Sequence, residues 1–228
     1  MTIIIKNQND IMDLEQEYIY SNSPINRIIS KTTAKNKFLE LDRLKKKIES
    51  IENCELKKNA NRIVFSDGDV DSPVMIIGEG PGQKEDELGK PFVGEAGLLL
   101  NKMLKAIKIN RENVYITNVV NYRPPKNRKP DPKEIKTYST YLNEHISIIN
   151  PKILILLGST AMEALLGTNL KITKERGIWR EIIIKNKTVK SIVTFHPAYL
   201  LRQPEQKKFS WEDLKSIKKK IDASDIKI

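Results

Sequence analysis

Three polar side chains that can do acid–base or hydrogen-bonding chemistry each follow a short apolar run. Glu79 comes directly after PVMIIG at 73–78, Asn118 directly after VYIT at 114–117, and His196 directly after a third apolar run. If these runs are parallel strands, their carboxyl ends share one edge of a sheet, which is where such sheets bind ligands. We therefore predict that Glu79, Asn118 and His196 face one common site.

The glycine-rich segment around Glu79 is either only a turn after a strand or a place where the backbone approaches a ligand closely. In GEGPG at 78–82, the glycines free the backbone and expose its N–H groups. The spacing matches neither the P-loop nor the dinucleotide-binding fingerprint, and a carboxylate would repel phosphate. A carboxylate at this position could instead bind a water molecule or stabilise a cation-like transition state.

Asn118 and Phe92 have side chains that can bind a flat heterocycle. An amide presents one donor and one acceptor side by side, which matches the Watson–Crick edge of a pyrimidine. Phe92 stands between Pro91 and Val93 in a loop. Its ring could belong to the core, but the loop position also allows it to serve as a stacking platform. The second histidine, His145, lies mid-helix, and we interpret it as a surface or half-buried residue.

The elements that must position these residues alternate between strands and helices. Strands are predicted at 73–78, 114–117 and 152–158 and twice within 180–195, and helices at 95–108, 132–149, 159–167 and from 210 onward. The segment 196–204 is predicted to be a loop. This alternation predicts an α/β fold with a central, mainly parallel sheet.

The first 50 residues differ in character from the rest. They are polar, rich in lysine and free of glycine, with helical spacing at 10–20 and 33–51. We predict a helical N-terminal appendage at 1–50, followed by one main domain at 51–228. The short apolar start has no basic head and acidic residues follow at once, so we expect no signal peptide.

The composition fits an ordinary soluble protein with a basic surface. Of the 228 residues, 39% are hydrophobic and 30% charged, and no apolar run approaches the length of a membrane span. The net charge of +11 indicates a polyanionic partner such as nucleic acid, but 31 Lys against 9 Arg also fits an A+T-rich genome. The single cysteine, Cys54, rules out an intrachain disulfide framework, and we expect a cytoplasmic protein without membrane contact.

Taken together, these motifs resemble the family 4 uracil-DNA glycosylases over about residues 54–214. The matching segments are GEGPG (78–82), GKPFVGEAGLLLNKML (89–104), YITNVVNYRPPKNR (115–128), ILILLGSTA (153–161), ITKERG (172–177) and FHPAYLLR (195–202). The resemblance implies a three-layer α/β/α sandwich and excision of uracil from single- or double-stranded DNA, as a step of base excision repair.

The resemblance also implies roles for the candidate residues in excision. Glu79 places the attacking water and favours the cation-like sugar. His196 donates a hydrogen bond to uracil O2, where negative charge grows, and backbone N–H groups near Gly80 add to this. No lysine nucleophile is implied, so we expect a monofunctional enzyme.

Further roles concern the recognition of the base. Asn118 is expected to donate to uracil O4 and to accept from N3–H, a pattern that cytosine reverses. Phe92 is expected to stack on the base. Glu85 is expected to occupy the space beside uracil C5 and so to exclude the methyl group of thymine.

A last group of residues is expected to contact DNA. Leu200, four residues after His196 in the predicted loop, is expected to wedge into the gap left by the flipped base. The residues predicted to contact phosphates are Arg123, Asn127, Arg128 and Arg202. For those in the RPPKNR loop, the alternative is a rigid turn whose charged side chains are only solvated.

One departure from the family pattern is large. Family 4 enzymes typically carry a 4Fe–4S cluster on four cysteines, and the corresponding places here are occupied by Ile51, Cys54, Tyr122 and Tyr138. Such a cluster needs about four thiolates. We therefore expect no cofactor and no metal, with side-chain packing in place of the cluster.

Other functions stay open at this point. A non-catalytic accessory protein of the same fold would bind nucleic acid, although it would not require Glu79, Asn118 and His196 together. A related glycosylase for hypoxanthine or mispaired thymine is a further alternative, which Asn118 disfavours. A covalently trapping uracil binder would need a histidine at 119–130, where the sequence has none. We expect a monomer.

Overall fold

The computed structural model describes residues 27–224, 226 and 228, with side chains from residue 36 onward. The chain divides into two compact units, residues 1–35 and 36–228. The helix predicted at 10–20 lies outside the described residues.

A central sheet forms the middle layer of the second unit. The sheet that the described residues form contains β1 (Asp67–Gly68), β2 (Val74–Gly78), β3 (Tyr115–Asn118), β4 (Ile153–Leu157), β5 (Trp179–Ile184) and β6 (Lys187–Thr194). Its order is β1-β3-β2-β4-β6-β5. The inner strands β3, β2, β4 and β6 run parallel, and the edge strands β1 and β5 pair antiparallel. The prediction of a mainly parallel sheet is confirmed.

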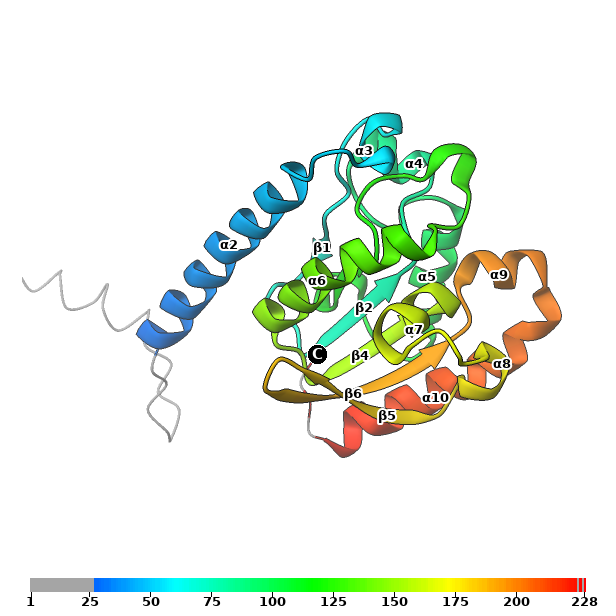
Figure 1. Cartoon of the computed structure of the whole chain (residues 1–228). Helices are drawn as coiled ribbons and strands as arrows, with labels where there is room; N and C mark the ends of the chain where they lie inside the picture. The colour runs from blue at the N-terminus through cyan, green and yellow to red at the C-terminus, as the bar shows by residue number, and fades with distance from the viewer. Residues whose placement is uncertain (1–26, 225, 227) are drawn as a thin grey trace, which may run out of the picture. The chain divides into compact units, whose positions relative to one another are not determined.

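Helices cover both faces of the sheet (Figure 1). They are α2 (Arg27–Glu49), α3 (Glu55–Asn59), α4 (Gln83–Leu88), α5 (Glu95–Ala106), α6 (Pro132–Ile149), α7 (Gly158–Leu166), α8 (Ile172–Glu175), α9 (Pro197–Arg202) and α10 (Lys207–Ala223), with 3₁₀ turns at Arg111–Asn113, Pro125–Asn127 and Pro204–Gln206. Figure 1 shows α6 and α7 on the near side of the sheet, with α10 behind it.

The alternation of side chains along the inner strands explains these layers. In β2, Met75 and Ile77 belong to one buried cluster, which includes residues of α6 and α7. Val74 and Ile76 belong to a second buried cluster, which includes residues of α5 and α10. Every residue of β2, β3 and β4 is buried, as expected for parallel strands covered on both faces. The predicted three-layer α/β/α sandwich is confirmed.

The start of α6 follows directly from local sequence. Asp131 caps the helix by accepting from the backbone N–H of Glu134, whose side chain accepts in turn from the N–H of Asp131. Pro132 occupies the first helical position, where its missing N–H costs nothing. These three residues start the helix at the predicted place and fix the end of the preceding loop, which borders the site.

The structure departs from the sequence-based boundaries in several places. The compact unit begins at residue 36 rather than 51, because Leu41, Leu44 and Ile48 of α2 are buried in its core. The predicted loop at 196–204 contains α9, and the glycine-rich segment after β2 contains α4. These helices are only six residues long, too short for helical periodicity to be recognised.

His145 belongs to the core, and its interpretation as a surface or half-buried residue is wrong. Its side chain is 2% exposed, with Nε2 2.7 Å from the Tyr115 hydroxyl oxygen and the Phe65 ring stacked at 4.5 Å between centroids. Burial lowers the pKa of His145 to about 3, so the ring is neutral at physiological pH. This histidine is therefore a structural residue.

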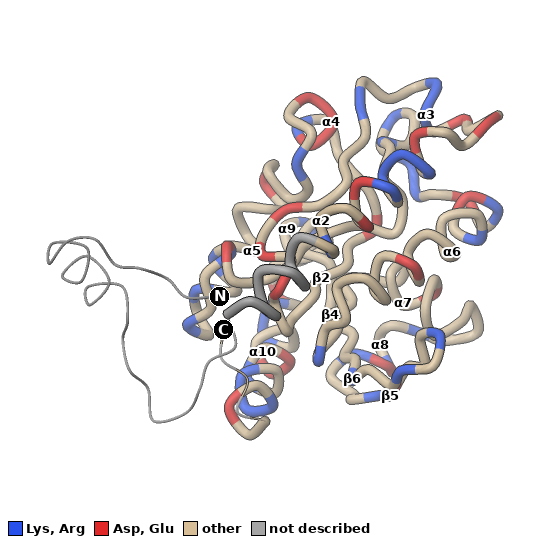
Figure 2. Tube along the Cα trace, turned by 90° about the vertical axis from the view of Figure 1, so that its left-hand side faces the viewer, with Lys and Arg blue, Asp and Glu red and all other residues tan. Residues whose placement is uncertain are grey.

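Basic and acidic side chains are interspersed on the elements seen in Figure 2. Along α10, for example, Lys215 pairs with Glu212 and Lys218 with Asp222. Basic and acidic residues are therefore paired along this helix. Within the described part of the chain, no helix has both the length and the apolar character needed to cross a bilayer.

Candidate active site

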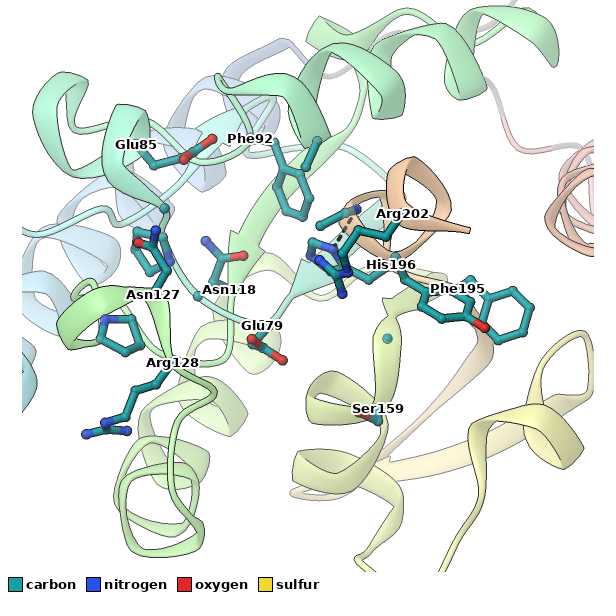
Figure 3. Close-up of a pocket in the computed structure, with 18 of the residues that line it drawn as sticks. Glu79, Glu85, Phe92, Asn118, Asn127, Arg128, Ser159, Phe195, His196 and Arg202 are labelled. Atoms are coloured by element: carbon teal, nitrogen blue, oxygen red, sulfur yellow. Dashed lines mark hydrogen bonds between the residues drawn. The ribbon is translucent and has the colours of Figure 1, made fainter. Parts of the chain in front are cut away.

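A pocket of about 510 Å³ opens at the carboxyl edge of the parallel strands. Its walls come from residues at or just after the ends of β2, β3, β4 and β6, which deliver Glu79, Asn118, Ser159 and His196 respectively. Figure 3 shows these side chains around one cavity. The structure thus brings Glu79, Asn118 and His196 together in the lining of one pocket, and their roles stay predictions.

Strand order explains why the pocket lies here. β2 and β4 are neighbours in the sheet; the connection after β2 leads to β3 on one side, and the connection after β4 leads to β5 and β6 on the other, so the two leave in opposite directions. The crevice outside the strand ends at such a switch point is the usual ligand site of α/β sheets. Gly78 at the end of β2 is in register with Asn118 at the end of β3, which sets Glu79 beside Asn118.

Glu79 is a half-buried carboxylate held from one side. The hydroxyl of Thr160, which is fully buried in the first turn of α7, donates to Glu79 Oε2. This contact bridges the ends of β2 and β4. It fixes the orientation of the carboxylate, and Glu79 itself lines the pocket.

His196 caps helix α9 and so has a defined protonation pattern. Its Nδ1 accepts a hydrogen bond from the backbone N–H of Ala198 at 3.1 Å, which requires that Nδ1 carry no proton. Burial, aided by the Arg202 guanidinium, lowers the pKa of His196 to about 4. The ring is therefore neutral at physiological pH, with its proton on Nε2 as a donor.

Asn118 presents an unsatisfied acceptor in the pocket wall. Its side chain is 3% exposed, and Oδ1 is a buried oxygen without a hydrogen-bond partner among the described residues. Leaving such an atom unpaired costs about 1–3 kcal/mol, so its presence at a cavity points to a ligand N–H. Gly78 is needed beside it, because a Cβ there would lie 2.4 Å from Oδ1.

Phe92 forms another wall of the pocket. Its ring centroid lies 5.5 Å from that of His196, and the two planes are tilted by 30°. Its backbone has φ +53°, an uncommon conformation for a bulky residue. The absence of a side chain at Gly97 permits this loop, because a Cβ there would lie 1.9 Å from the Phe92 carbonyl oxygen.

Glu85 and Gly80 also line the pocket, as the sequence analysis predicted. Glu85 is 9% exposed, and its Oε1 accepts from the backbone N–H groups of Val93 at 2.8 Å and Gly94 at 2.7 Å. One carboxylate oxygen thus holds the loop after Phe92. Gly80 packs so closely on Val120 that a Cβ would lie 2.7 Å from its methyl carbon.

Three of the four predicted phosphate-contacting residues line the pocket, namely Asn127, Arg128 and Arg202. Arg128 makes a bidentate ion pair with Glu134, with nitrogen–oxygen distances of 2.6 and 2.8 Å. Arg123 lies behind Asn127 and donates to its Oδ1 at 2.7 Å. Asn127 also has φ +55°, next to a second strained residue, Lys126, at φ +54°.

The placement predicted for Leu200 is wrong. Leu200 lies in helix α9 rather than in a loop, and only 1% of its side chain is exposed. It packs in the apolar cluster between the sheet and helices α5 and α10. A side chain buried in this way is not available to enter DNA, and its neighbour Leu201 is the exposed residue, at 41%.

We expect Leu200→Ala to lower the free energy of unfolding by about 2–5 kcal/mol, the usual cost of truncating a buried leucine. The matched variant Leu201→Ala should change it by less than about 0.5 kcal/mol, because that side chain is exposed. Denaturant unfolding of both variants checks this. Equal stabilities of the two variants would contradict the core assignment.

The four positions compared with cluster ligands do lie in one region of the core. Tyr122 and Tyr138 are 4% and 1% exposed, and Ile51 and Cys54 pack against the same cluster. The distance from Cys54 Sγ to the Tyr138 hydroxyl oxygen is 3.5 Å. Burial raises the pKa of Tyr122 to about 12, and it also raises that of Tyr138, so both phenols keep their protons. One thiol and two phenols do not fit an iron–sulfur cluster.

Two residues with clear roles in this site were missed by sequence reasoning. Thr160 lies in the GSTA segment after the predicted strand at 152–158, and its position at a strand end was the available signal. Arg111 lies outside the pocket lining but donates to the Phe92 carbonyl oxygen at 3.0 Å. No local pattern marks this arginine.

Comparisons with known proteins agree with this geometry. The sequence profile of the Uracil DNA glycosylase superfamily matches residues 65–215. The chain is similar to the type-4 uracil-DNA glycosylase of Thermotoga maritima, with 42% identity over 168 residues, 72% of this chain and 86% of that protein. It is 39% identical to that of Sulfurisphaera tokodaii over 78% of this chain and 83% of that protein, and 36% identical to that of Archaeoglobus fulgidus over 78% and 91%.

Proposed function

The chain belongs to the uracil-DNA glycosylase superfamily, and we propose on this basis that it hydrolyses the N-glycosidic bond of uracil in DNA and leaves an abasic site. The observation that carries the proposal is the pocket itself. It brings a half-buried carboxylate, a neutral imidazole and a buried amide oxygen without a partner to one cavity. This is a DNA repair reaction, and the enzyme is a monofunctional glycosylase.

The chemistry requires opposite charges at two places. As the bond breaks, the sugar becomes cation-like and the base leaves as an anion, by analogy with glycoside hydrolysis. Glu79 serves the sugar side, because its charge favours the cation and its Oε1 can hold the attacking water. Thr160 keeps this carboxylate oriented through its hydrogen bond to Oε2.

His196 serves the side of the leaving base. With Nδ1 engaged by the Ala198 N–H, the Nε2–H group is the donor that this pocket-lining ring has left to offer. We assign it to uracil O2, where negative charge develops. One such preorganised donor contributes about 2.7–4 kcal/mol to lowering the barrier. Backbone N–H groups near Gly80 add to this stabilisation.

Base recognition is assigned to Asn118, Phe92 and Glu85. The unpaired Oδ1 of Asn118 would accept from uracil N3–H, and its amide N–H would donate to O4. Cytosine offers an acceptor at N3 and a donor at N4, so it would leave both amide atoms mismatched. Phe92 provides the stacking surface. Glu85 lines the pocket, and its place beside uracil C5 stays a prediction.

DNA contacts are assigned to the rim of the pocket. Arg202 and Asn127 are exposed there, with Arg123 supporting Asn127. Arg128 can offer a phosphate only the N–H groups that Glu134 does not occupy, or after leaving that partner. Uracil must leave the base stack to reach the pocket, which costs a few kcal/mol in duplex DNA. We propose that both single- and double-stranded uracil-containing DNA are substrates.

We further propose that the enzyme works without an iron–sulfur cluster, as a monomer and in the cytoplasm. The cluster positions hold one thiol, and no group of three or more His, Cys, Asp or Glu side chains in the described residues could hold a metal ion. Excision of one base requires no second copy of the chain, which is the ground for proposing a monomer.

We expect the purified protein to be colourless and free of iron. The side-chain packing around Cys54, Tyr122 and Tyr138 should maintain this region of the core without a metal. Absorbance spectra and iron analysis of protein purified without oxygen check this. A broad band near about 400 nm with about four irons per chain, the signature of such a cluster, would show the proposal to be wrong.

The activity is tested with oligonucleotides that contain one uracil, either single-stranded or paired with G or A. After incubation with the purified protein, alkali cleaves the strand at each abasic site, and scission at the uracil position is the expected result. Strands with cytosine or thymine at the same position serve as controls. DNA binding without scission on any substrate would instead support an accessory protein of this fold.

A further inference from the structure

The loop that carries Phe92 needs outside support for its conformation. Residues 90–94 lie between α4 and α5 and form neither helix nor strand. Phe92 at their centre has φ +53°, in the left-handed region, which a phenylalanine adopts only when its surroundings impose it. Yet its ring is 6% exposed and forms a defined wall beside His196. Some other part of the protein must hold this loop.

Arg111 donates hydrogen bonds to two backbone carbonyl oxygens of this loop. Its Nη2 donates to the Pro91 carbonyl oxygen at 2.6 Å, and its Nη1 donates to the Phe92 carbonyl oxygen at 3.0 Å. The remaining donors bind Asn101 Oδ1 at 3.1 Å and Asp67 Oδ2 at 2.9 and 3.1 Å. These five bonds match the five N–H groups of a guanidinium. Arg111 thus ties the loop to β1 and to α5.

Glu85 accepts hydrogen bonds from two backbone N–H groups of the same loop. Its Oε1 accepts from the N–H groups of Val93 and Gly94, directly after Phe92. A positive group therefore holds the two carbonyls up to Phe92, and a negative group holds the two amides that follow. Figure 3 shows the Glu85 carboxylate and the Phe92 ring on the same side of the pocket.

From this geometry we propose that Arg111 is a positioning residue for uracil excision, which acts by fixing the Phe92 ring as a stacking surface for the base. Arg111 does not line the pocket, so it has no contact with the base itself. The proposal rests on the proposed function, because it assigns Phe92 to stacking. It adds a determinant that lies outside the pocket.

Lysine cannot replace arginine in this position. A guanidinium presents its donors in a planar fork that reaches two carbonyls and a carboxylate together, whereas an ammonium is a single point of charge. Arg111→Lys should keep the electrostatic attraction to Asp67 and lose some of the hydrogen bonds to the Pro91 and Phe92 carbonyl oxygens. We expect its excision rate to fall between those of the natural chain and Arg111→Gln.

A double-mutant cycle with Phe92 tests the proposal. Arg111→Gln should lower single-turnover excision by about 10- to 100-fold, the typical cost of misplacing a positioning group. In the Phe92→Ala background, the same change should cost less than about threefold, because there is no ring left to position. Equal losses in both backgrounds, or no loss in the natural chain, would overturn the proposal.

A matched control separates this effect from a general loss of stability. Arg180 lies outside the pocket and donates from Nε to Glu175 Oε2 at 2.8 Å. Arg180→Gln removes this ion pair and should leave the excision rate unchanged. Thermal unfolding of each variant ensures that rates are compared on folded protein. Excision by the natural chain shows that the proposed function holds, whatever the cycle reveals about Arg111.

A second measurement does not depend on activity. Contacts between the Phe92 and His196 rings, 5.5 Å apart between centroids, should give nuclear Overhauser effects in the natural chain. These should weaken or vanish in Arg111→Gln and persist in Arg180→Gln. Ring contacts that persist unchanged in Arg111→Gln would show that the arginine does not position Phe92, even for a protein that excises no uracil.

Discussion

Glu79→Gln and His196→Ala should each lower the single-turnover rate of uracil excision by about 10²–10³-fold, the range found for one preorganised catalytic group. Glu79→Gln keeps an oxygen that can accept from Thr160 but removes the charge that favours the cation-like sugar. His196→Ala removes the Nε2–H donor. Affinity for uracil-containing DNA should change little, because both interactions strengthen only as charge develops.

The control for these two variants is Glu144→Gln. Glu144 pairs with Lys47 at 2.6 Å on α6 and does not line the pocket, so its loss should leave excision unchanged. Rapid-mixing kinetics and equilibrium DNA binding give the two quantities. If Glu79→Gln or His196→Ala lost affinity and kept the rate of the bound complex, the residue would be a binding group and the assigned chemistry would be wrong.

The pH dependence of excision gives an independent check on His196. Because its pKa in the folded protein is about 4, lowered mainly by burial, the ring stays neutral as the pH falls from 8 to about 5. No loss of rate from this group is expected over that range. Below about pH 4 the ring gains a proton on Nδ1, which breaks the bond from the Ala198 N–H. A rate change near pH 6.5 that His196→Ala abolishes would contradict this protonation pattern.

Asn118→Asp should lower uracil excision by about 10- to 100-fold, because losing one hydrogen bond and leaving a buried polar atom unpaired costs about 1–3 kcal/mol. The amide donates to O4 and accepts from N3–H, whereas a carboxylate can only accept. When protonated, the aspartate presents an O–H that could pair with cytosine N3. Excision from cytosine-containing strands, measured from pH 5 to 8, should therefore rise as the pH falls.

Asn150→Asp is the matched control for this substitution. Asn150 ends helix α6, is exposed and does not line the pocket, so the same chemical change should have no effect on excision. Comparison of uracil and cytosine strands for both variants completes the test. Natural rates on uracil in Asn118→Asp would mean that the unpaired Oδ1 does not read the base.

Much of the fold could be predicted from local sequence. The strands at 73–78 and 152–158 and the capped start of α6 at Asp131 appear in the structure as expected. Apolar runs and helix caps act over a few residues, so their effect is legible without tertiary information. Parallel strands must also present their carboxyl ends at one edge, which is why Glu79, Asn118 and His196 were expected to meet.

The same local reasoning failed where burial is decided by distant packing. Leu200 follows His196 at a spacing that suits a DNA wedge, but helix α9 turns it into the core between α5 and α10. The compact unit begins ahead of the boundary predicted at 51 for a similar reason, because Leu41, Leu44 and Ile48 complete a core built from later residues. Neither outcome is encoded in the neighbouring sequence.

The sequence by itself determined the residue types at the site, the strands that deliver them and the edge at which they gather. Only the tertiary structure decided how those groups are held. It set the hydrogen bond from Thr160 to Glu79, the neutral state of His196 and the hydrogen bonds from Arg111 to the Phe92 loop. Hydrogen bonds between groups far apart in the chain, and the burial that shifts a pKa, arise only when the packed layers bring those groups together, and no local pattern records them.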